Sequence, residues 1–86
     1  MPTISSFYGI VIRMYHEEHG SPHFHAYYAG ESVAVSIETL DIMEGRLPRR
    51  ALGLVVDWAI EHRAELRENW RRAEAQLPLT RIDPLA

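Results

Sequence analysis

The segment HFHAYYAGESVAVSIE, residues 23–38, constrains the fold most, because apolar residues recur at every second position on both sides of one turn. Gly30-Glu31 separates the two runs, and a glycine at the first central position suits a two-residue type II′ hairpin turn. That turn predicts one apolar face with three cross-strand pairs: Tyr28 with Val33, Ala26 with Val35, and Phe24 with Ile37. The opposite face is mostly polar, and its predicted pairs are Tyr27 with Ala34, His25 with Ser36, and His23 with Glu38.

Further strands are expected on either side of this hairpin. Residues 4–15 alternate with a period of two, which indicates another strand, and residues 17–22 have the composition of a loop. Residues 39–47 are ambiguous and could hold a short fourth strand around residues 41–44 before Gly45 turns the chain. The expected fold class is therefore α+β, with three or four antiparallel strands in a β-meander.

The C-terminal half has the 3.6-residue period of helices. Pro48 fits the first position of a helix, and the apolar pattern continues, more thinly in its second half, until Pro78 stops it. One unbroken helix over residues 48–76 would be roughly 43 Å long, whereas a domain of this size has a radius of gyration of about 12 Å. We therefore expect a break near residues 62–64 and two C-terminal helices packed on one face of the sheet. A second half that projects onto a partner is the alternative.

The same periods predict a core. Its members share faces under the strand and helix patterns, and they are Ile10, Ile12, Phe24, Ala26, Val33, Val35, Leu52, Val55, Trp58 and Ala59. Trp58 and Trp70 stand at helical spacing, which is typical of core or interface residues.

Composition limits the class of protein. The chain has 86 residues, which fits a single domain over residues 1–86, and so small a core would gain from a partner protein or a homodimer. It has no cysteine, no apolar run near the ~20 residues of a membrane span and no signal-peptide pattern, so we expect a cytoplasmic domain of bacterial type. The formal net charge of −3 disfavours strong non-specific binding to nucleic acid.

Four of the five histidines crowd into residues 16–25. On a strand, His23 and His25 point to the same face, and the predicted register puts Glu38 opposite His23. Together with His19 on the preceding loop, they form a candidate site for zinc, nickel, copper or ferrous iron. Two other interpretations stay open, namely a solvated polar face and a surface that binds a partner.

The same cluster could perform acid–base catalysis instead. An imidazole titrates near pH 6.5, about where a general acid or base is useful, and Glu38 could orient His23 for that role. No nucleophile elbow, phosphate-binding loop or dinucleotide fingerprint accompanies these residues. The sequence therefore predicts catalytic candidates, His23, His25 and Glu38, without naming a reaction.

A second candidate site lies in LPRR, residues 47–50. Arg49 and Arg50 fall in the first turn of the predicted helix, where the helix dipole disfavours cations by about 0.3–1 kcal/mol. They could bind a phosphate or a partner's carboxylate together with the helix N–H groups. Alternatively, Glu44 or Asp41 neutralises them within the chain.

Several blocks of the sequence stand in an order that points to a known family. They are FYGIVIRMY, HGSPHFHA, IETL followed by EG and LPRRAL, and a later W…H…EL…NW pattern. Over essentially the whole chain, these blocks resemble the bacterial "domain of unknown function 4160" family. The residues that match its histidine motif are His19, Pro22, His23, Phe24, His25 and Ala26. Ser21 replaces a proline of that motif, and His16 lies outside it.

The resemblance implies no established activity. Members of the family are commonly encoded beside another small uncharacterised domain, in an arrangement that resembles toxin–antitoxin pairs. The first hypothesis is therefore a binding or regulatory module of such a pair, with a small cognate protein partner and a histidine-lined surface that could hold a metal.

The second hypothesis is a small metal-independent ribonuclease. His23 or His25 would act as general acid or base, and Arg49 or Arg50 would stabilise the phosphate charge. The net charge of −3 and the absence of lysine weigh against it, because RNA must be held by its phosphates.

Overall fold

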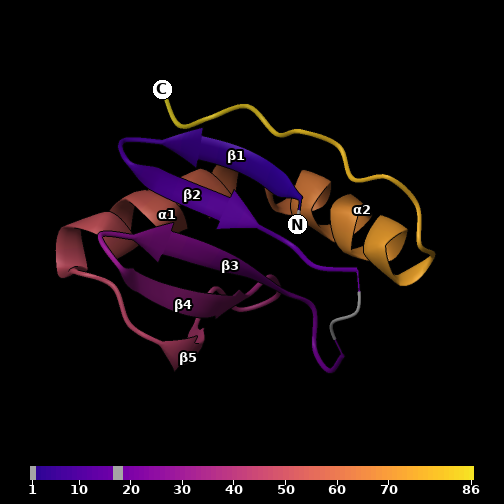
Figure 1. Cartoon of the computed structure of the whole chain (residues 1–86), viewed down its shortest axis with the longest axis horizontal. Coiled ribbons are helices and arrows are strands. Elements are labelled where there is room, and N and C mark those ends of the chain that lie inside the picture. Colours follow the sequence, from indigo (N-terminus) through magenta and orange to yellow (C-terminus); the bar gives the residue numbers. More distant parts are fainter. Residues whose placement is uncertain (1, 17–18) are drawn as a thin grey trace.

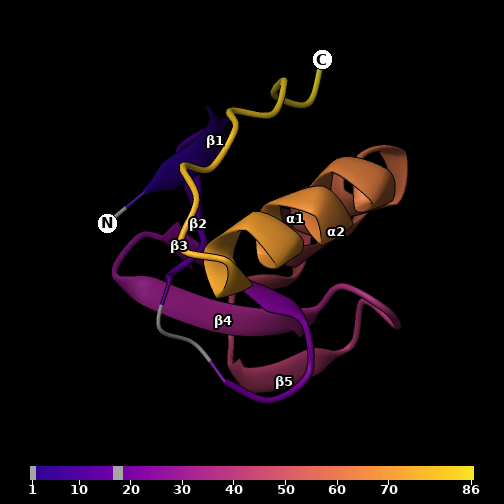
Figure 2. The same ribbon diagram turned by 90° about the vertical axis from the view of Figure 1, so that its right-hand side faces the viewer.

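The structure is a five-stranded antiparallel sheet followed by two helices that cover one of its faces (Figure 1). The computed structural model describes residues 2–16 and 19–86, so Glu17 and Glu18 of the expected loop lie outside the described residues. The strands stand in the sheet in chain order: β1 (Thr3–Phe7), β2 (Ile10–Arg13), β3 (His23–Tyr28), β4 (Glu31–Ser36) and β5 (Ile42–Gly45). The helices are α1 (Arg49–Glu61) and α2 (Arg63–Glu74), and Figure 2 shows both on the same side of the sheet. The α+β meander is confirmed, with five strands instead of three or four.

The extra strand comes from residues 4–15, which form a hairpin and not one long strand. Phe7 pairs with Ile10 across a two-residue turn, Tyr8-Gly9. Both turn residues have positive φ, 51° at Tyr8 and 80° at Gly9, as a type I′ turn requires. Tyrosine rarely adopts this backbone conformation, so a turn at Tyr8-Gly9 is hard to predict from the residue types.

The β3–β4 hairpin keeps the predicted faces but not the predicted register. Phe24 pairs with Val35 and Ala26 with Val33, so the turn is Ala29-Gly30, one residue earlier than expected. Both residues have positive φ, 50° and 81°, which again indicates a type I′ turn and not type II′. Every pair therefore shifts by two residues, a shift that leaves the two faces unchanged.

The shift changes the neighbour of the first histidine. His23 lies opposite Ser36, and Glu38 comes after the end of β4. The predicted pairing of His23 with Glu38 was wrong for this reason.

At the other side of the sheet, β5 confirms the expected short strand near residues 41–44. It pairs with β4 and carries an irregularity between the partners of Ala34 and Val35. Gly45 ends the strand with a φ of 81°, and a Cβ at this position would collide with the Ser32 carbonyl oxygen. Glycine is therefore required where β5 leaves the sheet.

The helical half divides at His62, within the expected residues 62–64. Pro48 was predicted at the first helical position, and the structure places it one position earlier, as the N-cap of α1. Its carbonyl accepts a hydrogen bond from Leu52 N–H at 2.9 Å. The second helix ends at Glu74, before Pro78. Gln76 takes a positive φ of 59°, and Leu77 N–H donates to the Arg72 carbonyl at 2.8 Å. This is the Schellman arrangement that terminates many helices.

The predicted core is nearly complete. Nine of the ten expected residues are buried, and Leu52 is half-buried. Phe24 packs against Trp58 of α1 with ring centroids 5.8 Å apart. No helix among residues 2–16 and 19–86 is both long and apolar enough to cross a membrane.

Residues 77–86 form an extended C-terminal segment that runs back over β1 and the helices (Figure 1). Ile82 N–H donates to the Ile4 carbonyl at 2.8 Å, so the segment binds the outer edge of β1. The Trp58 indole donates to the Asp83 carbonyl at 2.9 Å. Buried Asn69 makes two hydrogen bonds to the backbone of Thr80, at 2.8 and 2.9 Å. The segment is therefore an integral part of the domain.

Candidate functional site: the histidine–tyrosine face

His23 begins β3 and is almost fully buried, with 6% of its surface exposed. Its ring packs against Trp70 of α2, with centroids 5.1 Å apart. The Nδ1 atom lies 2.8 Å from the Ser21 carbonyl oxygen, which can only accept a hydrogen bond, so Nδ1 carries a proton. In the neutral ring, Nε2 is therefore the nitrogen with a lone pair.

His25 stands beside His23 on the same face, as their spacing predicts. The two ring centroids are 5.2 Å apart. His25 also contacts two tyrosines, with centroids 5.0 Å from Tyr15 and 6.4 Å from Tyr27. The two tyrosine hydroxyls are hydrogen-bonded to each other, and the Arg13 guanidinium lies 5.1 Å from the centre of the Tyr27 ring. We call Arg13, Tyr15, His23, His25 and Tyr27 the histidine–tyrosine face.

Arg13, Tyr15 and Tyr27 were not among the predicted site residues. A signal for them was present, because Tyr27 is two residues after His25 and therefore shares its face. Arg13 pairs directly with His25 in the register of β2 and β3. Once the first hairpin is recognised, the alternation places these side chains on one face, but it does not give the pairing of β2 with β3.

The other two predicted ligands do not join the histidine pair. Glu38 is half-exposed and forms an ion pair with Arg67, with an N–O distance of 3.0 Å. His19 is exposed on the loop before β3. Across the part of the chain that the structure describes, no three His, Cys, Asp or Glu side chains form a group suited to a metal ion. Of the four predicted ligands, the structure brings together His23 and His25.

His16 has a structural partner. Its Nε2 atom donates to the Leu77 carbonyl at 2.9 Å, and Gln76 Nε2 donates to the His16 carbonyl at 3.2 Å. These two bonds join the loop after β2 to the end of α2.

Arg49 and Arg50 are exposed in the first turn of α1, as predicted. Within residues 2–16 and 19–86, neither forms an ion pair, and the neutralising role expected for Glu44 or Asp41 is not seen. The first turn of α1 contains no acidic residue.

The arginines and histidines lie near opposite ends of β3. Arg50 lines a pocket with Tyr28, the last residue of that strand, whereas His23 is the first. The five steps between the ends of β3 span ~16 Å at about 3.3 Å per residue. The two predicted sites are therefore separate places on the molecule.

Comparison with known proteins places the chain in a family. A family model described as "Domain of unknown function (DUF4160)" matches residues 9–71. The chain belongs to this family. The matched region includes the histidine–tyrosine face and the start of α1, whereas β1 and residues 77–86 lie outside it. No curated protein and no solved structure matches the chain.

Proposed function

We propose that the protein is a binding and regulatory module, one half of a toxin–antitoxin-like pair, and that it binds its partner along the edge of β5. One observation supports this most directly: β5 is an open sheet edge that carries two adjacent exposed apolar side chains, Ile42 and Met43, which are 43% and 48% exposed. An exposed strand edge can accept a further strand from another protein through backbone hydrogen bonds.

The two edges of the sheet differ. At the β1 edge, Ile82 N–H already binds the Ile4 carbonyl, and Arg81 donates to the Thr3 carbonyl at 3.2 Å. At the β5 edge, no strand from the described part of the chain pairs on the outer side. A partner strand would therefore add at β5.

The charges beside β5 indicate the chemistry of the partner. Asp41 and Glu44 are exposed on this segment and make no ion pair with any described residue. A complementary strand would carry apolar residues opposite Ile42 and Met43, with lysine or arginine beside them. Complementary charge of this kind speeds association and selects among partners.

The histidine pair supports a second feature of this proposal, a site for a divalent transition metal such as zinc, nickel or iron. Metal-ligating histidines commonly donate one ring N–H to a carbonyl, and His23 does so to Ser21. His23 and His25 would supply two imidazoles, and a third ligand would come from His19 or from the partner. Such a metal would tie the loop before β3 to the sheet.

The metal proposal is tested by elemental analysis of protein purified without a histidine tag. We expect stoichiometric metal that is lost in His25→Ala. Glu38→Gln is the matched control, and it should retain the metal because Glu38 pairs with Arg67 and not with His23. Absence of metal in the wild-type protein, after titration with zinc, would refute the metal proposal and leave the β5 proposal standing.

The alternative, a metal-independent ribonuclease, needs histidine and arginine side chains on one phosphate. The ~16 Å length of β3 lies between them in this structure. No further observation in the described residues favours the nuclease.

The experiment is to express the chain in a bacterium, alone and with the product of the adjacent gene. We expect harmless expression of the chain alone and a stable complex in light scattering after gel filtration. Met43→Lys should weaken the complex at least tenfold, because a charge would replace a central apolar contact. Ile60→Lys is the control, since Ile60 is 59% exposed but lies on α1.

Three results would contradict the proposal. If Met43→Lys and Ile60→Lys bind alike, the β5 edge is not the docking site. If the wild-type chain alone forms a dimer that Met43→Lys dissociates, a second copy occupies this edge. If the chain alone arrests growth and His25→Ala relieves the arrest, the protein is a toxin with catalytic histidine.

A further inference from the structure

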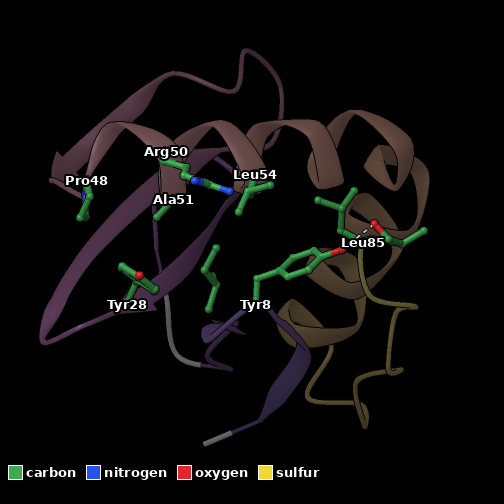
Figure 3. A pocket seen from close by; sticks show the side chains of 9 residues that line it. Tyr8, Tyr28, Pro48, Arg50, Ala51, Leu54 and Leu85 are labelled. Atoms are coloured by element: carbon green, nitrogen blue, oxygen red, sulfur yellow. Dashed lines mark hydrogen bonds between the residues drawn. The ribbon is translucent and has the colours of Figure 1, made fainter.

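A pocket of about 490 Å³ lies between the first half of α1 and the turn end of the sheet (Figure 3). Its volume is within the ~300–1,000 Å³ range of small-molecule sites. Three segments line it: the ends of the strands, the start of α1 and the end of the C-terminal segment. The lining residues that matter here are Tyr8, Ile10, Tyr28, Arg50, Leu54 and Leu85.

The pocket has apolar walls that are held in place. Ile10 is fully buried at its inner side, and Leu54 lies one helical turn after Arg50 on the same side of α1. Tyr8 is 61% exposed, and its hydroxyl donates to the Ala86 carbonyl at 2.9 Å, which holds the ring in position. Figure 3 shows Tyr8 and Tyr28 across the cavity from Arg50.

The single charged side chain in this lining is a cation. No aspartate or glutamate side chain lines the pocket, and Arg50 makes no ion pair with any residue in 2–16 or 19–86. The first turn of α1 has no acidic residue, so the positive end of the helix dipole adds to the positive potential. Ala86 also lines the pocket, and the Tyr8 hydroxyl binds its main-chain oxygen, so the Arg50 guanidinium is the group in this lining that can bind an anion.

We propose that this pocket binds a carboxylate carried on an aromatic or branched aliphatic body. The apolar body would lie among Tyr8, Tyr28 and Leu54. The carboxylate would accept two hydrogen bonds from the Arg50 guanidinium, whose planar fork matches its geometry. This site is distinct from the β5 edge and does not depend on the proposed function. Two sources share the chemistry: a free small acid and the C-terminal carboxylate of a peptide that ends in an aromatic residue.

The test is titration of the full chain, followed by backbone amide NMR. The probes are 3-phenylpropionate, its uncharged amide, and a short peptide with a C-terminal phenylalanine carboxylate. We expect shifts at Gly9 and Ala51, with the acid binding about tenfold more tightly than the amide. Peptide binding tighter than that of 3-phenylpropionate would identify a chain terminus as the natural occupant. Equal or weaker peptide binding would identify a free acid, and either result supports the site.

Two substitutions locate the charge. Arg50→Gln should weaken 3-phenylpropionate binding about tenfold. Arg49→Gln makes the same change in net charge one residue away, outside the pocket lining, and should change affinity by less than about twofold. Tyr8→Ala, at an exposed wall residue, should weaken the acid and the amide alike. Equal affinity for acid and amide, equal losses in the two arginine variants, or no shifts with any probe would overturn the proposal.

Discussion

Asn69→Ala should destabilise the protein more than any other single polar substitution on α2, because Asn69 holds the C-terminal segment. Its side chain is 1% exposed, its Nδ2 donates to the Thr80 carbonyl, and its Oδ1 accepts from the Thr80 N–H. Two hydrogen bonds at about 1 kcal/mol each, with about 1 kcal/mol for lost packing, give about 2–3 kcal/mol. Thr80 is exposed, so its backbone N–H and carbonyl can form hydrogen bonds with water in the variant. The expected loss of stability therefore lies near the lower value of this range.

The assay is urea unfolding followed by tryptophan fluorescence. With a slope of about 1 kcal/mol per molar urea, the midpoint should fall by about 2–3 M without a change in slope. Thr80→Ala is the matched control, because Thr80 contributes only backbone atoms to these bonds, and it should cost less than about 0.5 kcal/mol. If Thr80→Ala costs as much as Asn69→Ala, or Asn69→Ala costs nothing, the pair does not hold the segment.

Two further predictions concern backbone strain and charge. Gly45→Ala should lower the free energy of unfolding by about 3 kcal/mol or more, measured by thermal unfolding, because the new Cβ collides with the Ser32 carbonyl oxygen. Gly30→Ala is the control, because Gly30 has the same φ of 81° but open space around it. A similar loss in Gly30→Ala would refute the steric explanation. The pKa of Glu68 lies below its usual value, mainly because Arg71 donates a hydrogen bond to this carboxylate. The ionised carboxylate therefore stabilises the fold at pH values above its ordinary pKa. This stabilisation is lost as the pH falls through the lowered pKa. In Glu68→Gln, the melting temperature should therefore fall less between about pH 5 and pH 2 than it does in the wild-type protein. An equal fall in the two proteins would contradict this prediction.

The two faces of the hairpin were predictable from the sequence, but its register was not. A period of two distinguishes inward from outward residues, and a shift by two residues leaves that distinction unchanged. Only the turn could settle the register, and its first residue is Ala29 with a φ of 50°. Alanine is uncommon in this conformation, so Gly30-Glu31 looked the better turn, and His23 was given the wrong partner as a result.

The burial of His23 depends on contacts that are distant in sequence. Alternation correctly placed His23 on the face opposite Phe24, but it did not show that the His23 ring would be buried. Trp70, which is 47 residues further along the chain, covers the ring from α2. The break at His62 was predictable from the length of the helical pattern, but the approach of α2 to His23 depends on how the helices pack.

The closed β1 edge and the open β5 edge together limit what the protein can assemble into. A sheet that can grow at both sides can add copies without end, as fibres do. In this domain, the C-terminal segment binds along the β1 edge, which leaves the β5 edge for a further strand. A strand that pairs with β5 occupies that edge, whether it comes from a different protein or from a second copy. If a strand adds at β5, assembly through strands would therefore stop at two chains, because residues 77–86 cover the β1 edge.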